Sequence, residues 1–128
     1  MTYTDITNFF KSVFPEFENF YTFIRDDNKD KSLTIYKING ISSDNQLGGN
    51  IHKVMGCQLQ IVYTDSVLSS EEKIHELTNY IANTKTQIKQ INNKEFYLIP
   101  KNGDEDFFYF GTTKGRYHYY GIDLLIYY

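Results

Sequence analysis

The feature that most constrains the fold is the stretch formed by residues 116–128, which reads RYHYYGIDLLIYY. Aromatic and branched aliphatic residues dominate this stretch and it contains no proline, so it is predicted to form a β-strand. Side chains alternate between the two faces of a strand. One face carries Tyr120, Ile122, Leu124, Ile126 and Tyr128, and the other carries Tyr117, Tyr119, Asp123, Leu125 and Tyr127. Because both faces are largely apolar or aromatic, both need cover, either from the chain itself or from a neighbouring molecule.

The composition is typical of a globular domain with unusually many tyrosines. The 128 residues are expected to form a single domain, residues 1–128, and they include 12 Tyr and 10 Phe but no Trp. Tyrosine at this density suits sheets and interfaces, because it buries a ring and keeps a polar tip. The net charge of −3 argues against a protein that binds nucleic acid through a basic surface.

The sequence also suggests a compartment. No apolar run approaches the roughly 18 residues that cross a bilayer, so no membrane partner is expected. The first residues lack a basic stretch followed by an apolar one, so no secretion signal is expected. The single cysteine, Cys57, excludes an internal disulfide, and together these features indicate a reducing cytoplasm.

Hydrophobic spacing predicts two helices and several strands. One helix is expected over residues 5–14, with Thr4 as its N-cap, and a second begins at Ser69 or Ser70. Strands are expected at residues 33–38, 51–64, 95–100 and 106–110 and in the stretch 116–128. Residues 16–25 fit a helix or an extended chain equally well.

A long loop is predicted between the first and second strands. Residues 39–50 are rich in Gly, Asn and Ser, which supply most kinds of turn chemistry. A loop of this length is uncommon in a small domain and is often functional.

No catalytic or metal site can be recognised in the sequence. His52, His75 and His118 lack the spacing of a metal or acid–base site, so they are expected to be structural or surface residues. Cys57 shares a strand face with apolar residues and is expected to be a core residue.

Two further motifs favour plain structural interpretations. The acidic residues 104–106 follow a turn but lack the spacing of a calcium loop, so a solvated turn is expected. Gly48 and Gly49 lack the Gly-Lys-Ser/Thr of a phosphate loop and precede a strand, so a flexible loop is expected. We therefore expect no enzyme, no cofactor and no bound metal.

Four stretches of the sequence, taken in their order along the chain, can be compared with known protein families. They are an amphipathic helix over residues 6–14 that ends at Phe14-Pro15, LTIYKING at residues 33–40, QLQI at residues 58–61 with the helix after it, and TKGRYHY at residues 113–119 leading into the last three residues. Together they cover nearly the whole chain. The series resembles the tail-terminator, or head-to-tail joining, proteins of long-tailed bacteriophages, which are often grouped as minor capsid proteins.

The resemblance implies a fold, a function and a location. It implies an α+β fold with a mixed, mostly antiparallel sheet and two helices packed on it. It implies that six copies close a hexameric ring on the tail-tube protein and present a surface to the head-completion or connector protein, while DNA only passes through the lumen. Free subunits of this family are often monomers. The resemblance also implies that assembly begins in the host cytoplasm and ends in the virion, at the head–tail interface.

Eight residues are candidate interface residues in such a ring. Residues 41–50 are expected to reach a neighbouring subunit and to order on docking, and Arg116 and two tyrosines of the closing strand are expected to anchor the contact. The candidates are Ile41, Asn45, Gly48, Gly49, Asn50, Arg116, Tyr117 and Tyr119. A simpler interpretation of Arg116 is that its side chain reaches solvent at the start of a strand.

Other functions remain open at this stage. A small acidic cytoplasmic inhibitor, such as an immunity-type binding protein, would share the acidic charge and the Tyr-rich surface. A stopper or adaptor protein, which joins the tail from the head side, is an alternative closely related to the tail-terminator hypothesis. An enzyme with an unrecognised site is the least favoured alternative, because no convergent polar set is visible.

Overall fold

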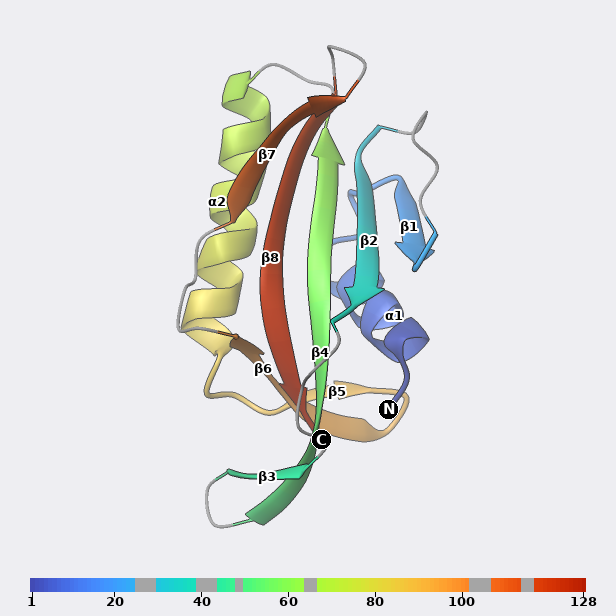
Figure 1. The fold of residues 1–128 in the computed structure, drawn as a ribbon, viewed down its shortest axis with the longest axis vertical. Coiled ribbons are helices and arrows are strands. Elements are labelled where there is room, and N and C mark those ends of the chain that lie inside the picture. The colour runs from blue at the N-terminus through green and yellow to red at the C-terminus, as the bar shows by residue number, and fades with distance from the viewer. Residues whose placement is uncertain (25–29, 39–43, 48–49, 64–66, 102–106, 114–116) are drawn as a thin grey trace.

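The computed structural model describes residues 1–24, 30–38, 44–47, 50–63, 67–101, 107–113 and 117–128 (Figure 1). These residues form two helices and eight strands. The elements are α1 (Tyr3–Val13), β1 (Asn19–Thr22), β2 (Ser32–Lys37), β3 (Asp44–Leu47), β4 (Asn50–Tyr63), α2 (Val67–Thr84), β5 (Lys89–Ile91), β6 (Lys94–Pro100), β7 (Phe108–Thr113) and β8 (Tyr117–Tyr127).

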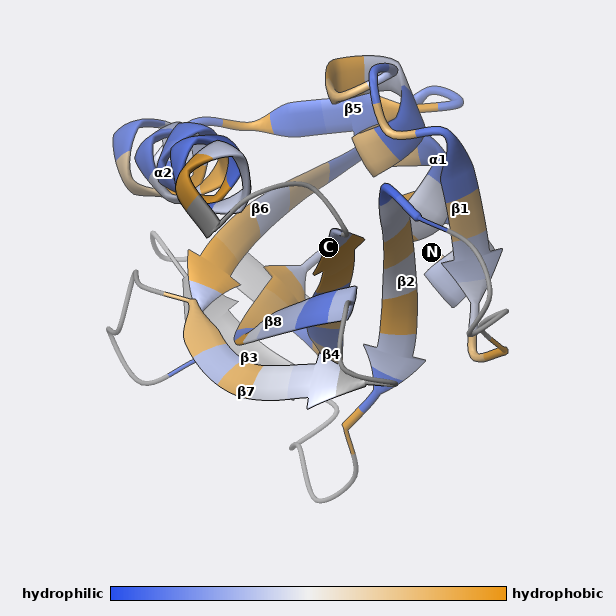
Figure 2. Ribbon diagram, turned by 90° about the horizontal axis from the view of Figure 1, so that it is seen from above, coloured by the Kyte–Doolittle hydropathy of each residue, from blue (hydrophilic) through white to orange (hydrophobic). Residues whose placement is uncertain are grey.

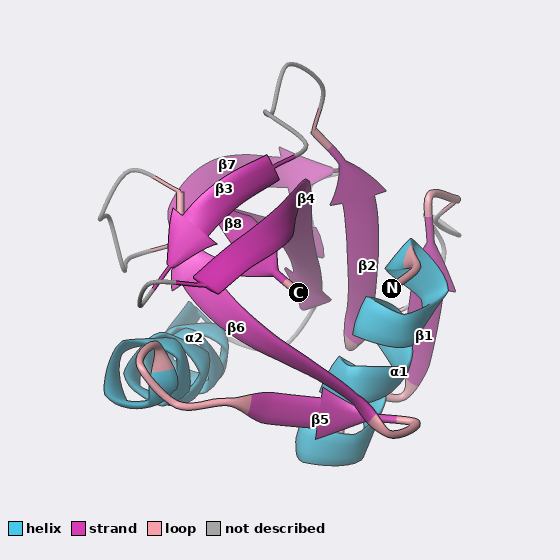
Figure 3. Ribbon diagram, turned by 90° about the horizontal axis from the view of Figure 1, so that it is seen from below, coloured by secondary structure: helices cyan, strands magenta, loops and turns pink. Residues whose placement is uncertain are grey.

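The strands form one sheet in the order β1-β2-β4-β8-β6-β5, with β3 paired to β4 and β7 paired to β8. The β1–β2 pair is parallel and the other pairs are antiparallel. The sheet curls strongly, as the views along its long axis show (Figures 2 and 3). The prediction of an α+β fold with a mixed, mostly antiparallel sheet is confirmed.

Helix α1 begins at a capping box. The Thr2 hydroxyl accepts a hydrogen bond from the Asp5 N–H at 3.1 Å, and the Thr2 N–H donates to Asp5 Oδ2 at 2.8 Å. Thr2 is therefore the N-cap, and the prediction of Thr4 was wrong. Lys94 Nζ lies 2.9 Å from Asp5 Oδ2 and ties this end of α1 to β6. The hydrogen bonds from Lys94 and Thr2 lower the pKa of Asp5 to about 2.

The core lies between the helices and one face of the sheet. Strands β4 and β8 pair Leu59 with Ile122 and Cys57 with Leu124, and all four side chains are buried. Helix α1 adds Ile6, Phe9 and Phe10, and α2 adds Leu77 and Ile81. Of the two faces predicted for the strand in residues 116–128, the one that carries Tyr120, Ile122, Leu124 and Ile126 therefore points into the protein. The prediction that Cys57 is a core residue is confirmed.

Three short strands were not predicted from the sequence. Strand β1 lies in the segment left ambiguous, and β5 pairs with β6 across a turn in which Asn92 and Asn93 have φ of 51° and 64°. Strand β3 lies inside the predicted loop of residues 39–50, where it forms a hairpin with the start of β4. This hairpin projects from one end of the sheet (Figure 1).

Candidate assembly surface

The face of the sheet turned away from the helices carries a chain of polar side chains. Gln58 Nε2 donates to Asp123 Oδ1 at 2.9 Å, which joins β4 to β8. Gln60 Nε2 donates in turn to Gln58 Oε1 at 2.6 Å. Because each amide is held by its neighbour, the network fixes the side chains before any partner arrives. We call this side of the sheet the open face.

A hollow lies on the open face beside this network. Its volume is about 540 Å³. It is lined by Tyr36, Gln58, Gln60, Phe110 and Tyr119. The ring of Phe110 lies over Gly121, where an added Cβ would be 2.4 Å from Phe110 Cε2. Glycine at this position therefore allows the ring to pack on the sheet.

Strand β7 presents three consecutive aromatic side chains to solvent. Phe108, Tyr109 and Phe110 are each a little over half exposed, at 53%, 55% and 53%. The pairing of β7 with β8 shifts register between Tyr109 and Gly111, and Gly111 has φ of 103°, which favours glycine. Strand β7 has β8 on one edge, and no other described strand pairs with it. We call Phe108, Tyr109 and Phe110 the β7 flank.

The β7 flank is fastened to the body of the protein through Tyr109. The Tyr109 ring lies 5.2 Å from the Tyr120 ring, and its hydroxyl lies 3.1 Å from His118 Nδ1. The Tyr120 hydroxyl is hydrogen bonded to Ser70 Oγ in α2 at 2.8 Å. The flank is thus exposed but held in place, which suits a docking surface.

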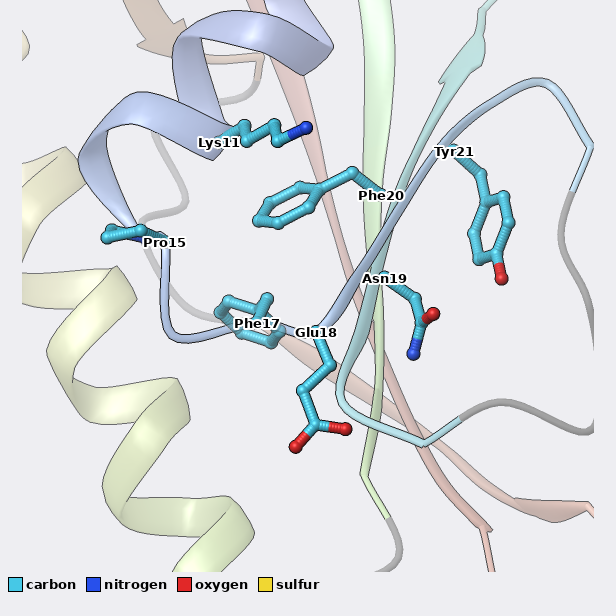
Figure 4. A pocket seen from close by; sticks show the side chains of 7 residues that line it. All are labelled: Lys11, Pro15, Phe17, Glu18, Asn19, Phe20 and Tyr21. Carbon is cyan, nitrogen blue, oxygen red and sulfur yellow. The ribbon is translucent and has the colours of Figure 1, made fainter.

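The second hollow lies at the other end of the strand order, beside β1 (Figure 4). Its volume is about 620 Å³, and it is lined by Lys11, Pro15, Phe17, Glu18, Asn19, Phe20 and Tyr21. Phe17 is buried and its ring lies 6.4 Å from that of Phe20, so the hollow has an aromatic floor. Lys11 and Glu18 are exposed and give it a charged rim. We call it the β1 hollow.

The structure places the predicted interface residues in different settings. Ile41, Gly48, Gly49 and Arg116 lie outside the described residues. Asn45 lies in β3, opposite His52, and Asn50 begins β4, opposite Leu47.

The two predicted tyrosines also differ. Tyr119 is half-buried and lines the open-face hollow, whereas Tyr117 is only 2% exposed. Little of Tyr117 is therefore left for a partner to cover. The β7 flank was missed as an interface, although the run Phe107–Phe110 (FFYF) was a signal for it: the sequence predicts the strand but not which side chains the fold leaves uncovered.

The described residues contain no cluster of metal-binding side chains. Among them, no group of three or more His, Cys, Asp or Glu side chains could hold a metal ion. His75 is exposed on α2, while His118 contacts Tyr109. Burial raises the pKa of Cys57 to about 12, so its thiol is protonated at neutral pH. None of the described helices is long and apolar enough to cross a membrane.

Comparison with known proteins supports the fold. The sequence matches no protein-family model and no curated protein. The structure is similar to a solved protein structure whose name states no function, with a TM-score of 0.54 and 14% sequence identity. The match covers 97% of this chain and 87% of that chain. The protein therefore shares its α+β fold with that chain, and at this identity the likeness extends to the fold alone.

Proposed function

We propose that this protein is a structural subunit of a long-tailed bacteriophage, where copies of it close a ring on the tail tube and join the tube to the head connector. The observation that carries the proposal is the β7 flank, an edge strand with three half-exposed aromatic side chains. Exposed apolar edges of this kind pair with other chains. The sequence resemblance supplies the identity of the assembly.

The β3–β4 hairpin supports the same function. It projects from one end of the sheet, where a neighbouring subunit or the tail tube can reach it (Figure 1). Its two strands pair Asp44–Leu47 with Asn50–Lys53. The hairpin keeps the role first given to residues 41–50, that of an arm which contacts a neighbour.

The charge of the protein suits a ring through which DNA moves. A net charge of −3 gives no overall attraction to the phosphate backbone. DNA would therefore slide through the lumen instead of being held by it. The assembly would take place in the host cytoplasm and end in the virion.

Electron microscopy of tails made with and without this protein tests the proposal. Without the protein we expect overlong tubes, or tails of normal length that never join heads. Joined particles of normal length in its absence would reject the proposal. A tight one-to-one complex with a basic enzyme would instead favour the inhibitor alternative.

A further inference from the structure

We infer that the β7 flank of one copy docks against the β1 hollow of the next copy. The inference rests on the proposed ring, and it names the two surfaces that would close it. A ring needs a heterologous contact, in which each subunit offers two different surfaces. A contact between two identical surfaces would stop at a dimer.

The two surfaces lie at opposite ends of one run of strands. The order is β1-β2-β4-β8, with β7 next to β8. Strands β1 and β7 are therefore separated by three strands and lie on opposite sides of the subunit (Figure 1). One subunit can thus contact two neighbours at once.

The two surfaces are complementary in chemistry. The β7 flank carries aromatic rings that protrude, and the β1 hollow has an aromatic floor formed by Phe17 and Phe20. The hollow is open and has a volume of about 620 Å³, which leaves room for side chains of a neighbouring copy. The exposed Lys11 and Glu18 give the hollow the polar rim that interfaces have around an apolar centre.

The exposed aromatic area of β7 is a sizeable part of what one partner buries in a standard protein–protein interface. Phe108 lies opposite Gly121 and the Phe110 ring lies over Gly121, whereas Tyr109 turns toward Tyr120 on the other face, so one contact can cover the first two rings. An aromatic side chain buries roughly 150–250 Å², so two half-exposed rings can bury about 200 Å². A standard interface buries about 800 Å² on each partner, so these two rings supply about a quarter of that share. On the other side, Phe23 and Ile24 directly follow β1 and are 48% and 79% exposed.

Main-chain groups can add to the contact. Asn19, the first residue of β1, donates its N–H to Lys31 O at 3.3 Å, so the main-chain N–H of this residue points toward the chain at the start of β2. Successive residues of a strand point these groups to alternate sides, so those of Thr22 and Phe20 point away from β2. Strand β7 likewise has a second edge, and two such edges can pair.

Site-specific cross-linking tests the inference. Glu18→Cys places a thiol at the β1 hollow, and Thr112→Cys places one on β7 without removing an aromatic ring; both native side chains are exposed. Asn83→Cys, exposed on α2, is the matched control. A short bis-maleimide reagent is applied to each variant at high concentration and to the chain bound to purified tail tubes. The buried Cys57 should not react.

The expected pattern is specific to a head-to-tail contact. The double variant E18C/T112C should give a ladder of multimers, and an equal mixture of the two single variants should give dimers. Each single variant alone, and the control, should remain monomeric. Dimers from T112C alone, or a double variant that cross-links no better than the control, would overturn the inference.

Binding to tail tubes separates this inference from the proposed function. If the wild-type chain sediments with tubes but the double variant gives no ladder there, the contact is wrong and the function stands. If a ladder forms but the chain never binds tubes, the contact stands and the function is wrong.

Discussion

Replacing Gly121 with alanine tests whether Phe110 is held on the open face by the strand beneath it. An alanine Cβ would lie 2.4 Å from Cε2 and 3.0 Å from Cζ of Phe110, so the ring would have to move. The next nearest atom, the Leu59 carbonyl oxygen, is at an ordinary contact distance of 3.6 Å. Because only the far end of a half-exposed side chain is in the way, the ring should swing outward and the sheet should stay intact.

Two opposing effects set the change in the free energy of unfolding. Alanine in place of glycine inside a strand stabilises by about 0.5–1 kcal/mol. Displacing a half-exposed Phe ring loses about half of the 1.5–3 kcal/mol of full burial, or about 1 kcal/mol. The two effects nearly cancel in the wild-type background. In a Phe110→Ala background only the gain remains, so the two positions should couple by about 1 kcal/mol.

Urea unfolding of the four proteins of this cycle, followed by circular dichroism, measures the coupling. Phe108→Ala is the matched control, because Phe108 is equally exposed and is not among the atoms nearest to the added Cβ. Gly121→Ala should show little coupling in that background. An equal effect of Gly121→Ala with and without the Phe110 ring would refute the packing of Phe110 on Gly121.

Three further predictions concern stability and reactivity. The pKa of Asp5 is lowered from 3.8 to about 2, so its carboxylate should contribute about 1 kcal/mol above pH 4 after solvent screening, and this should be lost between pH 4 and pH 2. Urea unfolding across this range should show a smaller loss in Asp5→Asn. Thr34→Val should raise the urea midpoint by the equivalent of about 1 kcal/mol, since the buried Thr34 hydroxyl has no partner among the described residues. Cys57 should react with maleimide only as the protein unfolds.

Long alternating patterns made much of the fold predictable. Strands β4 and β8 were predicted because apolar residues alternate over ten or more positions, and period-two spacing of that length has few other interpretations. Strand β5 has only three residues and β3 has the sequence DNQL, so neither carries such a pattern. These strands form because a hairpin partner is adjacent, which is a tertiary effect.

The candidate site was less predictable than the fold. The sequence shows that residues 107–110 are aromatic, but their exposure depends on β7 lying at an edge. The β1 hollow brings together Lys11, from the predicted first helix, and Tyr21, from the segment left ambiguous, and the sequence indicated neither as a site residue. The alternation of residues 116–128 did predict a second apolar face, and the structure leaves its Leu125 and Tyr127 half-buried on the open face.

The contrast between the edges of the sheet favours assembly over a solitary protein. Edge strands are commonly protected by charged residues, by proline or by short length. At one end of the sheet β5 is only three residues long, and the neighbouring β6 carries exposed Lys94 and Glu95. Strand β7 has no charged residue between Phe108 and Thr113 and exposes three aromatic rings. The unprotected aromatic edge of β7 therefore supports the proposal that a partner covers this strand. The separate β1 hollow, on the same chain, supports the proposal that the partner is another copy.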